Sequence, residues 1–343
     1  MRKINGVPFT AHIDLSSLTG GEVIKWDSTN TLMAWEDQDS TGYVPWVFQG
    51  SNYGYTCGGA DSDGDGQENT LTRFSFSSTG NASSWGTLNI ALLATTSQSS
   101  SDYGYNAGSS GFNGSTSHNY ITRFSFTSSS DTTDVGNLTQ ARHNGSGQSS
   151  STHGFVAGGY TGSGVVDTID KFAFASSGDS TDHGDLSVSE KQAVPGQSST
   201  DYGFTAGGQY GSGGSWLAMN IVDKFAFTSN TTASDHGDLS VSRWDGIGIS
   251  SATDGFTCGG NTSNTTIDKF SFSSNTTASD HGDLSVGRKL GAGHSGVDNG
   301  WISGGYAWAT GQEIDKFAYS SNTTATDWGD LPVNRLRVAG CQY

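Results

Sequence analysis

Three histidines in this chain occupy one recurring position, each directly before Gly-Asp-Leu: His183, His236 and His281. Histidine is a common metal ligand, and zinc needs three or four ligands that converge on one ion. Other copies of the same short segment fill the position with different bulky side chains: Trp85, Val135 and Trp328. A position that accepts Trp and Val requires bulk rather than a ligand, so we predict that these histidines pack and bind no metal.

An acidic segment, Asp61-Ser-Asp-Gly-Asp-Gly66, is the sharpest local motif. Asp61, Asp63 and Asp65 match the first three ligand positions of a calcium-binding loop, whose turn also needs a glycine. The twelfth position of that frame, where a bidentate Glu belongs, is Thr72. We therefore expect an acidic, solvated turn. Calcium held by these three aspartates is the alternative, and no other cofactor is expected.

Residues for nucleophilic or acid/base catalysis are not found in a suitable pattern. Gly293-His-Ser-Gly296 lacks the closing glycine of the hydrolase elbow, and no Gly-x-x-x-x-Gly-Lys phosphate loop is present. Adjacent Asp-Lys residues recur at 170–171, 223–224, 268–269 and 315–316. Catalysis needs one asymmetric constellation, so a pair that recurs at the same position of several units indicates structural charge pairing. We predict that the chain is not an enzyme.

The three cysteines show no disulfide framework. Cys57 and Cys258 occupy the position that other repeats fill with small residues, where a buried thiol packs like an alanine.

A period of about fifty residues organises the chain. A glycine followed by an aromatic residue opens a short segment that usually ends in Gly-Gly, at 54–55, 104–105, 154–155, 203–204, 255–256 and 300–301. A Phe-x-Phe type segment follows each copy, at 71–76, 121–126, 169–174, 222–227, 267–272 and 314–319. The Gly-Asp-Leu type segment comes about ten residues later, and most copies place an arginine four positions after its Leu: Arg142, Arg243, Arg288 and Arg335.

These segments are short, rich in aromatic and β-branched residues, and bounded by Gly, Asn, Asp, Ser and Thr, which is typical of strands between turns. Four such strands fit into each unit. A four-stranded antiparallel sheet that repeats in this way predicts an all-β chain folded as a β-propeller.

The blade count depends on the two ends of the chain. The last repeat continues through Arg335 to Tyr343 and then stops, so its remaining strands must come from the N-terminal region. Residues 1–43 offer three strands, at 8–13, 22–27 and 31–35. We predict seven blades in a single domain, with the C-terminal strand closing an N-terminal blade formed by residues 1–43. Six blades within residues 44–343, with residues 1–43 as an attachment arm, is the alternative.

The order of a basic residue, an apolar strand that ends in Gly207-Gly208, an aromatic strand and an aromatic-to-Leu segment resembles the kelch repeat. Over residues 44–343 it is similar to the kelch-like arrays in structural proteins of marine tailed phages. The resemblance implies a propeller, and it implies a place in a virion.

Composition excludes several partners. The 33 acidic and 16 basic side chains give a net charge of −17, which repels nucleic acid and anionic membrane surfaces. No apolar run approaches the roughly 20 residues of a membrane span, and the first ten residues, MRKINGVPFT, lack the apolar stretch of a secretory signal. We expect neither nucleic-acid binding nor membrane insertion.

The loops after the Gly-Gly strand differ most between repeats and carry six aromatic residues: Phe112, Tyr160, Tyr210, Trp216, Tyr306 and Trp308. Variable loops on a rigid scaffold usually carry binding, and exposed aromatics suit both protein contacts and sugar stacking. We expect a non-enzymatic structural or adhesion protein on the surface of a phage virion, in a tail, fibre or capsid appendage, that contacts other virion proteins or further copies of itself. A lectin-like propeller for a host cell-surface glycan or receptor is the alternative. A propeller-based oxidase or glycosidase is a third hypothesis. It requires a non-repeating cluster of metal ligands or carboxylates at one mouth of the channel.

Overall fold

The computed structural model describes residues 3–4, 7–8, 22–27, 32–37, 48–61, 66–111, 116–188, 191–211, 216–261, 264–306 and 311–343. The chain divides into two compact units, Met1–Trp46 and Val47–Tyr343. Within the described ranges the regular elements are β-strands, with no α-helix.

The first unit contains two small antiparallel sheets. β1 (Lys3–Ile4) pairs with β2 (Val7–Pro8), and β3 (Glu22–Asp27) pairs with β4 (Leu32–Asp37). β3 coincides with the strand predicted at 22–27.

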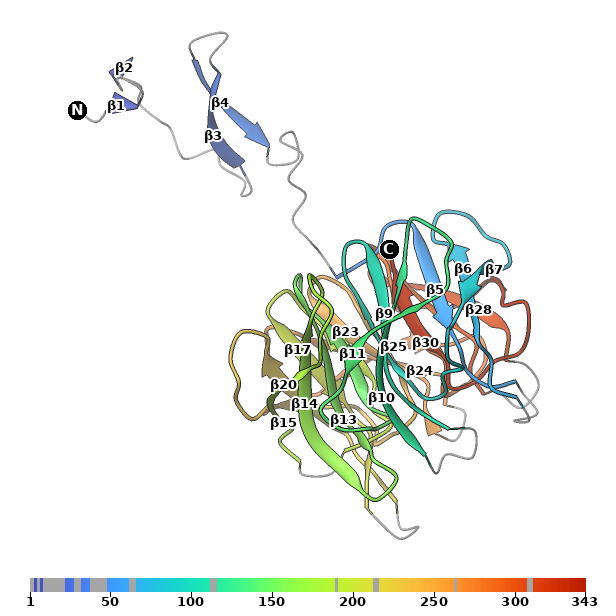
Figure 1. The fold of residues 1–343 in the computed structure, drawn as a ribbon. Coiled ribbons are helices and arrows are strands. Elements are labelled where there is room, and N and C mark those ends of the chain that lie inside the picture. Colours follow the sequence, from blue (N-terminus) through green and yellow to red (C-terminus); the bar gives the residue numbers. More distant parts are fainter. Residues whose placement is uncertain are drawn as a thin grey trace. The chain divides into compact units, whose positions relative to one another are not determined.

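The second unit is a β-propeller of four-stranded antiparallel blades, as the repeat predicts (Figure 1). The first blade contains β8 (Thr96–Ser99), β9 (Tyr103–Ser110), β10 (Ser117–Ser125) and β11 (Thr133–Asn137). The next two contain β12 (Ser146–Ser149), β13 (His153–Tyr160), β14 (Val165–Ala173) and β15 (Thr181–Asp185), then β16 (Gly196–Ser198), β17 (Tyr202–Ala206), β20 (Ile221–Ala226) and β21 (Ser234–Asp238). Two more contain β22 (Ile247–Ser250), β23 (Asp254–Cys258), β24 (Thr266–Ser271) and β25 (Ser279–Asp283), then β26 (Ala292–Ser295), β27 (Asn299–Ser303), β28 (Glu313–Ala318) and β29 (Thr326–Asp330). The sixth contains β30 (Ala339–Gln342), β5 (Tyr53–Cys57), β6 (Thr70–Ser75) and β7 (Ser83–Thr87). We name each blade by its inner strand, which is given first.

The last strand closes the ring on the first repeat. β30 pairs antiparallel with β5, with Ala339 opposite Cys57. The inner strands contact one another in the cyclic order β8, β12, β16, β22, β26, β30 and β8 again. The prediction of seven blades is therefore wrong for the described residues, and the six-blade alternative fits. That prediction divided the chain length by the period and counted residues 1–43 as a repeat, whereas residues 53–87 supply the strands that complete the last one.

A closed circle of backbone hydrogen bonds surrounds the axis. In each blade, one residue that stands two or three positions before the inner strand has a positive φ, between 52° and 60°. These residues are Ala94, Asn144, Ala193, Asp245, Leu290 and Arg337. We call these six residues the axial ring. The N–H of each donates to the carbonyl oxygen of the ring residue in the preceding blade, at 2.7–3.2 Å, and Ala94 N–H donates to Arg337 O to complete the circle. The left-handed conformation costs free energy for residues other than glycine. Here each axial ring residue forms a hydrogen bond between blades in this conformation.

Glycines allow the inner strands to approach closely. One equivalent position of the inner strands is Ser97 in the β8 blade and glycine in the others: Gly147, Gly196, Gly248, Gly293 and Gly340. A Cβ added to any of these glycines would overlap the carbonyl oxygen of the equivalent residue in the preceding blade. In these five blades the close approach therefore requires a residue without a side chain.

The hydrophobic core is divided among the blade interfaces. The aromatic residue of each Gly-aromatic segment lies against the last aromatic residue of the Phe-x-Phe segment in the next blade. Phe155 and Phe227 illustrate the contact, with ring centroids 4.7 Å apart, and Phe204 and Phe272 repeat it at the same distance. Nearest-neighbour stacking of this kind is the physical basis of a repeat architecture.

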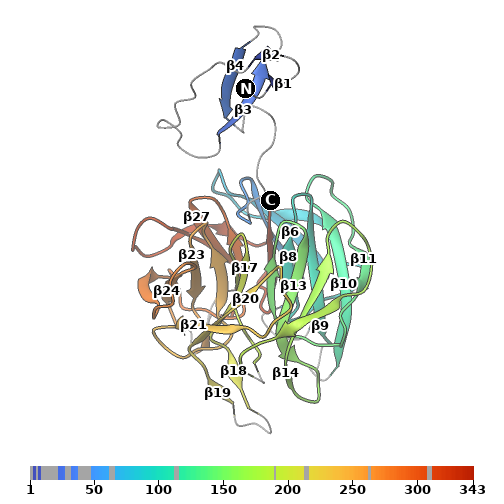
Figure 2. The same ribbon diagram turned by 90° about the vertical axis from the view of Figure 1, so that its left-hand side faces the viewer.

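The connections lie on two faces. Because β22 and β23 are antiparallel, the axial ring residue Asp245 and the loop that follows β23 lie at the same end of their blade. We call this end of the propeller the loop face. The turns between the first and second strands of each blade lie on the opposite side, which we call the turn face. The hairpin of β18 (Gln209–Tyr210) and β19 (Leu217–Ala218) lies at the end of the propeller opposite to the C-terminus (Figure 2).

Candidate functional site

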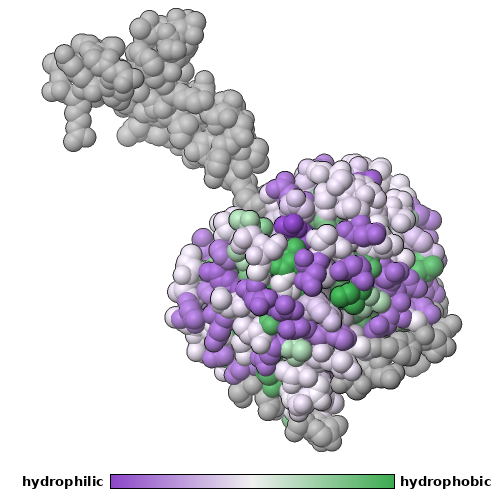
Figure 3. Space-filling model, in the orientation of Figure 1, coloured by the Kyte–Doolittle hydropathy of each residue, from purple (hydrophilic) through white to green (hydrophobic). Residues whose placement is uncertain are grey.

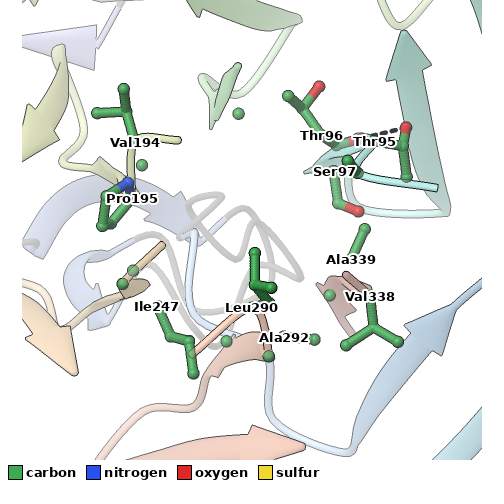
Figure 4. Close-up of a pocket in the computed structure, with 18 of the residues that line it drawn as sticks. Thr95, Thr96, Ser97, Val194, Pro195, Ile247, Leu290, Ala292, Val338 and Ala339 are labelled. Carbon is green, nitrogen blue, oxygen red and sulfur yellow. Dashed lines mark hydrogen bonds between the residues drawn. The ribbon is translucent and has the colours of Figure 1, made fainter. Parts of the chain in front are cut away.

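A cavity of about 150 Å³ lies on the propeller axis (Figure 4). The axial ring residues line it at the loop face, together with Val194, Pro195 and Val338. Phe48, Ser295 and Gln342 also line it, toward the turn face. There the Gln342 side-chain amide donates to Phe48 O at 3.0 Å, and the Gln49 amide donates to Ser250 O at 3.1 Å. The segment that leads into β5 therefore crosses the turn-face end of the axis.

Only two axial ring positions carry a charged side chain. Asp245 pairs with Lys289, with 3.4 Å between Oδ2 and Nζ. Burial raises the pKa of Asp245 above its ordinary value, and the positive charges of Lys289 and Arg337 oppose this rise. The Arg337 side chain is exposed and makes no hydrogen bond or ion pair among the described residues. Since Lys289 neutralises Asp245, the axial ring keeps one positive charge, that of Arg337, on a chain of net charge −17.

His143 lies beside this mouth. Burial lowers the pKa of His143 to about 4, and the positive charge of Arg337 acts in the same direction. The neutral imidazole lies 3.1 Å from Ser117 Oγ through Nδ1. It contributes a polar ring to the loop face but no charge at neutral pH.

An aromatic cluster joins two blades on the loop face. Trp216, from the β16 blade, meets Tyr160, from the β12 blade, edge to face with ring centroids 6.3 Å apart. Tyr160 in turn meets His143 edge to face at 5.5 Å. The sequence predicts Tyr160 and Trp216 as binding residues, and the structure brings these two together. It places Tyr210 opposite Leu217 in the β18–β19 hairpin, with 40% and 56% of their surfaces exposed.

The remaining predicted aromatic residues lie apart from this cluster or outside the described residues. Tyr306 and Lys289 exchange backbone hydrogen bonds of 2.7 and 3.2 Å, so Tyr306 lies near the charged side of the mouth. Phe112 and Trp308 lie outside the described residues.

The calcium interpretation depends on a loop that is only partly described. Asp63 and Asp65 lie outside the described residues, and the Asp61 N–H donates to Gly66 O at 3.3 Å. Within the described ranges no group of three or more His, Cys, Asp or Glu side chains is arranged to hold a metal ion. Calcium therefore stays a prediction.

The three repeated histidines pack between blades, as predicted. Each lies within hydrogen-bonding distance, through Nε2, of a carbonyl oxygen in the next blade: His183 of Ala226 O, His236 of Ser271 O and His281 of Ala318 O, at 2.8–3.0 Å. Burial lowers the pKa of His183 and of His236. Trp85 and Trp328 donate from Nε1 to the equivalent oxygens, of Ser125 and Ser75. The sequence predicts only a bulky side chain at this position, whereas five of its six occupants also place a ring nitrogen within hydrogen-bonding distance of the next blade.

The repeated aspartates form buried ion pairs, but not with the adjacent lysines. Four blades contain the pair: Arg142–Asp170 at 3.1 Å, Lys191–Asp223 at 3.0 Å, Arg243–Asp268 at 2.6 Å and Arg288–Asp315 at 2.5 Å. Each cation comes from the connection before the inner strand of the same blade. Lys191 was missed in the sequence because it stands five positions after Leu186 rather than four. All three cysteines are unpaired and buried.

Comparison with known proteins adds no identification. No model of a protein family matches this chain, and no curated protein matches it either. A search of the described residues finds no helix long and apolar enough to cross a membrane.

The axial ring was not recognised in the sequence, because its residue types vary from Ala to Arg. The signal was the spacing alone, since each ring residue stands two positions after the basic residue or its equivalent, as in Arg243 and Asp245 or Leu92 and Ala94.

Proposed function

We propose that this chain is a non-enzymatic structural and adhesion protein on the surface of a phage virion, in a tail, fibre or capsid appendage. In this proposal the loop face contacts other virion proteins or further copies of the chain. Residues 1–43 serve as the attachment arm. The virion context comes from the resemblance of the repeat to phage kelch-like arrays.

The observation that carries the proposal is the difference between the strands of each repeat, whose polar side chains are used for structure, and the loops, which vary. Histidines, arginines and aspartates that suggest chemistry recur at equivalent positions of several blades and serve in packing or ion pairing, as His183 and the Arg243–Asp268 pair illustrate. The loop face instead carries side chains that differ from blade to blade. A uniform scaffold with individual loops supports binding by contact rather than catalysis.

The exposed side chains of the loop face support protein contact in particular. Tyr210 and Leu217 lie opposite each other, both exposed, on the hairpin that follows the Gly-Gly strand of the β16 blade. Three equivalent valines in the connections between blades are also exposed: Val241, Val286 and Val333. The side of the molecule seen in Figure 3 is largely hydrophilic, with apolar residues in small separate groups. Isolated apolar anchors within a polar surface are typical of interfaces between proteins that are each soluble alone.

The test uses purified phage particles whose genome encodes the chain. We expect its peptides in the mass spectrum of the particles and immunogold label at one defined location on them. A Tyr210→Ser, Leu217→Ser double variant should be incorporated less, whereas a turn-face variant, Val297→Ser, should be incorporated normally. Particles that lack the chain would contradict the proposal.

Glycan binding is the second candidate, and the Tyr160–Trp216 contact favours it. An aromatic face beside hydroxyl and amide groups suits sugar stacking. Binding on a glycan array should disappear in Trp216→Ala and persist in Trp85→Phe, which changes a tryptophan between blades. Equal binding by both variants would exclude this subsite.

A further inference from the structure

The axial cavity combines enclosure with one unpaired positive charge. Its volume of about 150 Å³ is similar to that of an engineered protein cavity that binds benzene, so it is large enough for a small organic molecule. The enclosing strands are rich in glycine and contribute little side-chain bulk at the axis. Charge recognition must therefore come from the side chains at the mouth, since the other polar residues that line the cavity, such as Ser97 and Gln342, are neutral.

The backbone of the axial ring is not available to bind a ligand's charge. Each ring N–H and each ring carbonyl oxygen already takes part in the closed circle of hydrogen bonds. A ligand at the mouth therefore meets side chains rather than backbone donors. Among these side chains, that of Arg337 has no hydrogen-bond or ion-pair partner in the described part of the chain.

The position of the Arg337 charge follows from its neighbours. The positive charge of Arg337 lowers the pKa of His143, on one side of it in the ring, and that of Asp245, on the other side. Its guanidinium thus lies within electrostatic range of both sides of the mouth. Asn144, which also lines the cavity, is separated from Arg337 by Ala94 alone in the ring order.

The opposite neighbour of Arg337 is apolar. Leu290 precedes it in the ring, and Val338 follows it in the chain and is buried. Figure 4 shows Leu290 and Val338 among the residues that surround the cavity. A ligand anchored on Arg337 therefore has apolar surface beside its anchor.

From this arrangement we propose that the axial cavity binds a carboxylate with a short aliphatic body, the carboxylate on Arg337 and the aliphatic part against Leu290 and Val338. A planar guanidinium binds a carboxylate through two parallel hydrogen bonds. The ligand is either a free small acid or the side chain of an acidic residue of a partner polypeptide. The mouth of this site is on the loop face, but its test does not depend on the assembly contacts proposed above.

The test is a titration followed by the methyl NMR signals of Leu290 and Val338. The probes are butyrate, its neutral counterpart butyramide, and glutamate blocked at its amino and α-carboxyl groups. We expect butyrate or blocked glutamate to shift these signals saturably at millimolar concentration, and butyramide to leave them unchanged. Binding of butyrate alone indicates a free acid, and binding of blocked glutamate indicates a polypeptide side chain.

The matched variant is Arg337→Asn, because asparagine occupies the equivalent ring position at Asn144 with φ 55°. It removes the charge and keeps a residue suited to the backbone. We expect affinity to fall about tenfold or more, the usual effect of losing a hydrogen bond to a charged group. Arg123→Gln, which removes an arginine that lies over Tyr103 away from the axis, should leave affinity unchanged. Absence of a saturable shift, equal shifts with butyramide, or equal affinity in Arg337→Asn would overturn the proposal without affecting the assembly test.

Discussion

Arg243 and Asp268 form an ion pair inside the β22 blade, with 2.6 Å between Nη2 and Oδ2 and both side chains buried. Three other blades contain an equivalent pair, with Lys191 in place of arginine in one of them, and two blades depart from it. The equivalent residues are Leu92 and Thr122 in the β8 blade and Arg335 and Thr72 in the β30 blade. The β8 blade thus contains a neutral version of the site, and the β30 blade contains a version with the cation but without the carboxylate.

Removal of one partner should destabilise the propeller strongly. In Asp268→Ala, Arg243 becomes a buried charge without a counter-ion, and the free energy of unfolding should fall by about 3–5 kcal/mol. The double variant Arg243→Leu, Asp268→Thr reproduces the pair found at Leu92 and Thr122 and should recover about half of this loss. Urea unfolding monitored by tryptophan fluorescence measures both. A double variant no more stable than Asp268→Ala would show that charge burial is not the cause.

Thr72→Asp should stabilise the propeller, because it supplies the missing counter-ion. Burial lowers the pKa of Arg335 to about 10, and its Nη2 donates to Thr72 Oγ1 at 2.6 Å. Asp at this position completes the pair seen in four other blades, so we expect a gain of about 1 kcal/mol or more. Thr122→Asp is the control, since Leu92 offers no positive charge there, and it should destabilise. The same sign for both substitutions in thermal unfolding would contradict this account.

Acid should weaken ring closure through His294. This residue is fully buried between the β26 and β30 blades, with Nδ1 3.0 Å from Cys341 O and Nε2 2.8 Å from Ser303 Oγ. Burial lowers its pKa from 6.5 to about 4. Because the folded pKa lies below the unfolded value, its stabilising effect is complete above pH 6.5 and is lost as the pH falls toward 4, by roughly 3 kcal/mol in total. His143, whose pKa is also lowered to about 4, acts in the same pH range.

His294→Gln separates this contribution from that of the carboxylates. Glutamine occupies the equivalent position at Gln98, Gln148 and Gln197, where its amide donates to a carbonyl oxygen in the next blade. Between pH 7 and pH 4.5 the free energy of unfolding should fall by about 2 kcal/mol more in the wild type than in this variant. Equal losses in the two proteins would rule out His294 as the source.

Close approach of the inner strands should make Gly248 intolerant of any side chain. A Cβ there overlaps Gly196 O, and relief requires movement of the backbone. We expect Gly248→Ala to cost about 1–3 kcal/mol, the usual effect of overpacking. Ser97 is the equivalent residue of the β8 blade and already has a Cβ, so Ser97→Ala should cost less than 1 kcal/mol, chiefly for its hydrogen bond to Asn106 Oδ1. Similar losses in both variants would contradict the packing argument.

The period and the strand types could be predicted because every repeat has to bury the same aromatic residues against its neighbour. Ring closure could not, since nothing in Ala339–Gln342 distinguishes a partner at Tyr53–Cys57 from one nearer the N-terminus. The contact between Tyr160 and Trp216 was likewise hidden, because the two residues belong to different blades and their loops differ in length. Residue type predicted which side chains to examine, and only the fold showed which of them meet.

Hydrogen exchange of the chain, compared between its free form and purified virions, tests the proposed role most directly. The account predicts new protection on the loop face, at residues 209–211 and 216–218, with the turns between first and second strands unchanged. New protection confined to the turn face, or identical exchange in the two states, would contradict it.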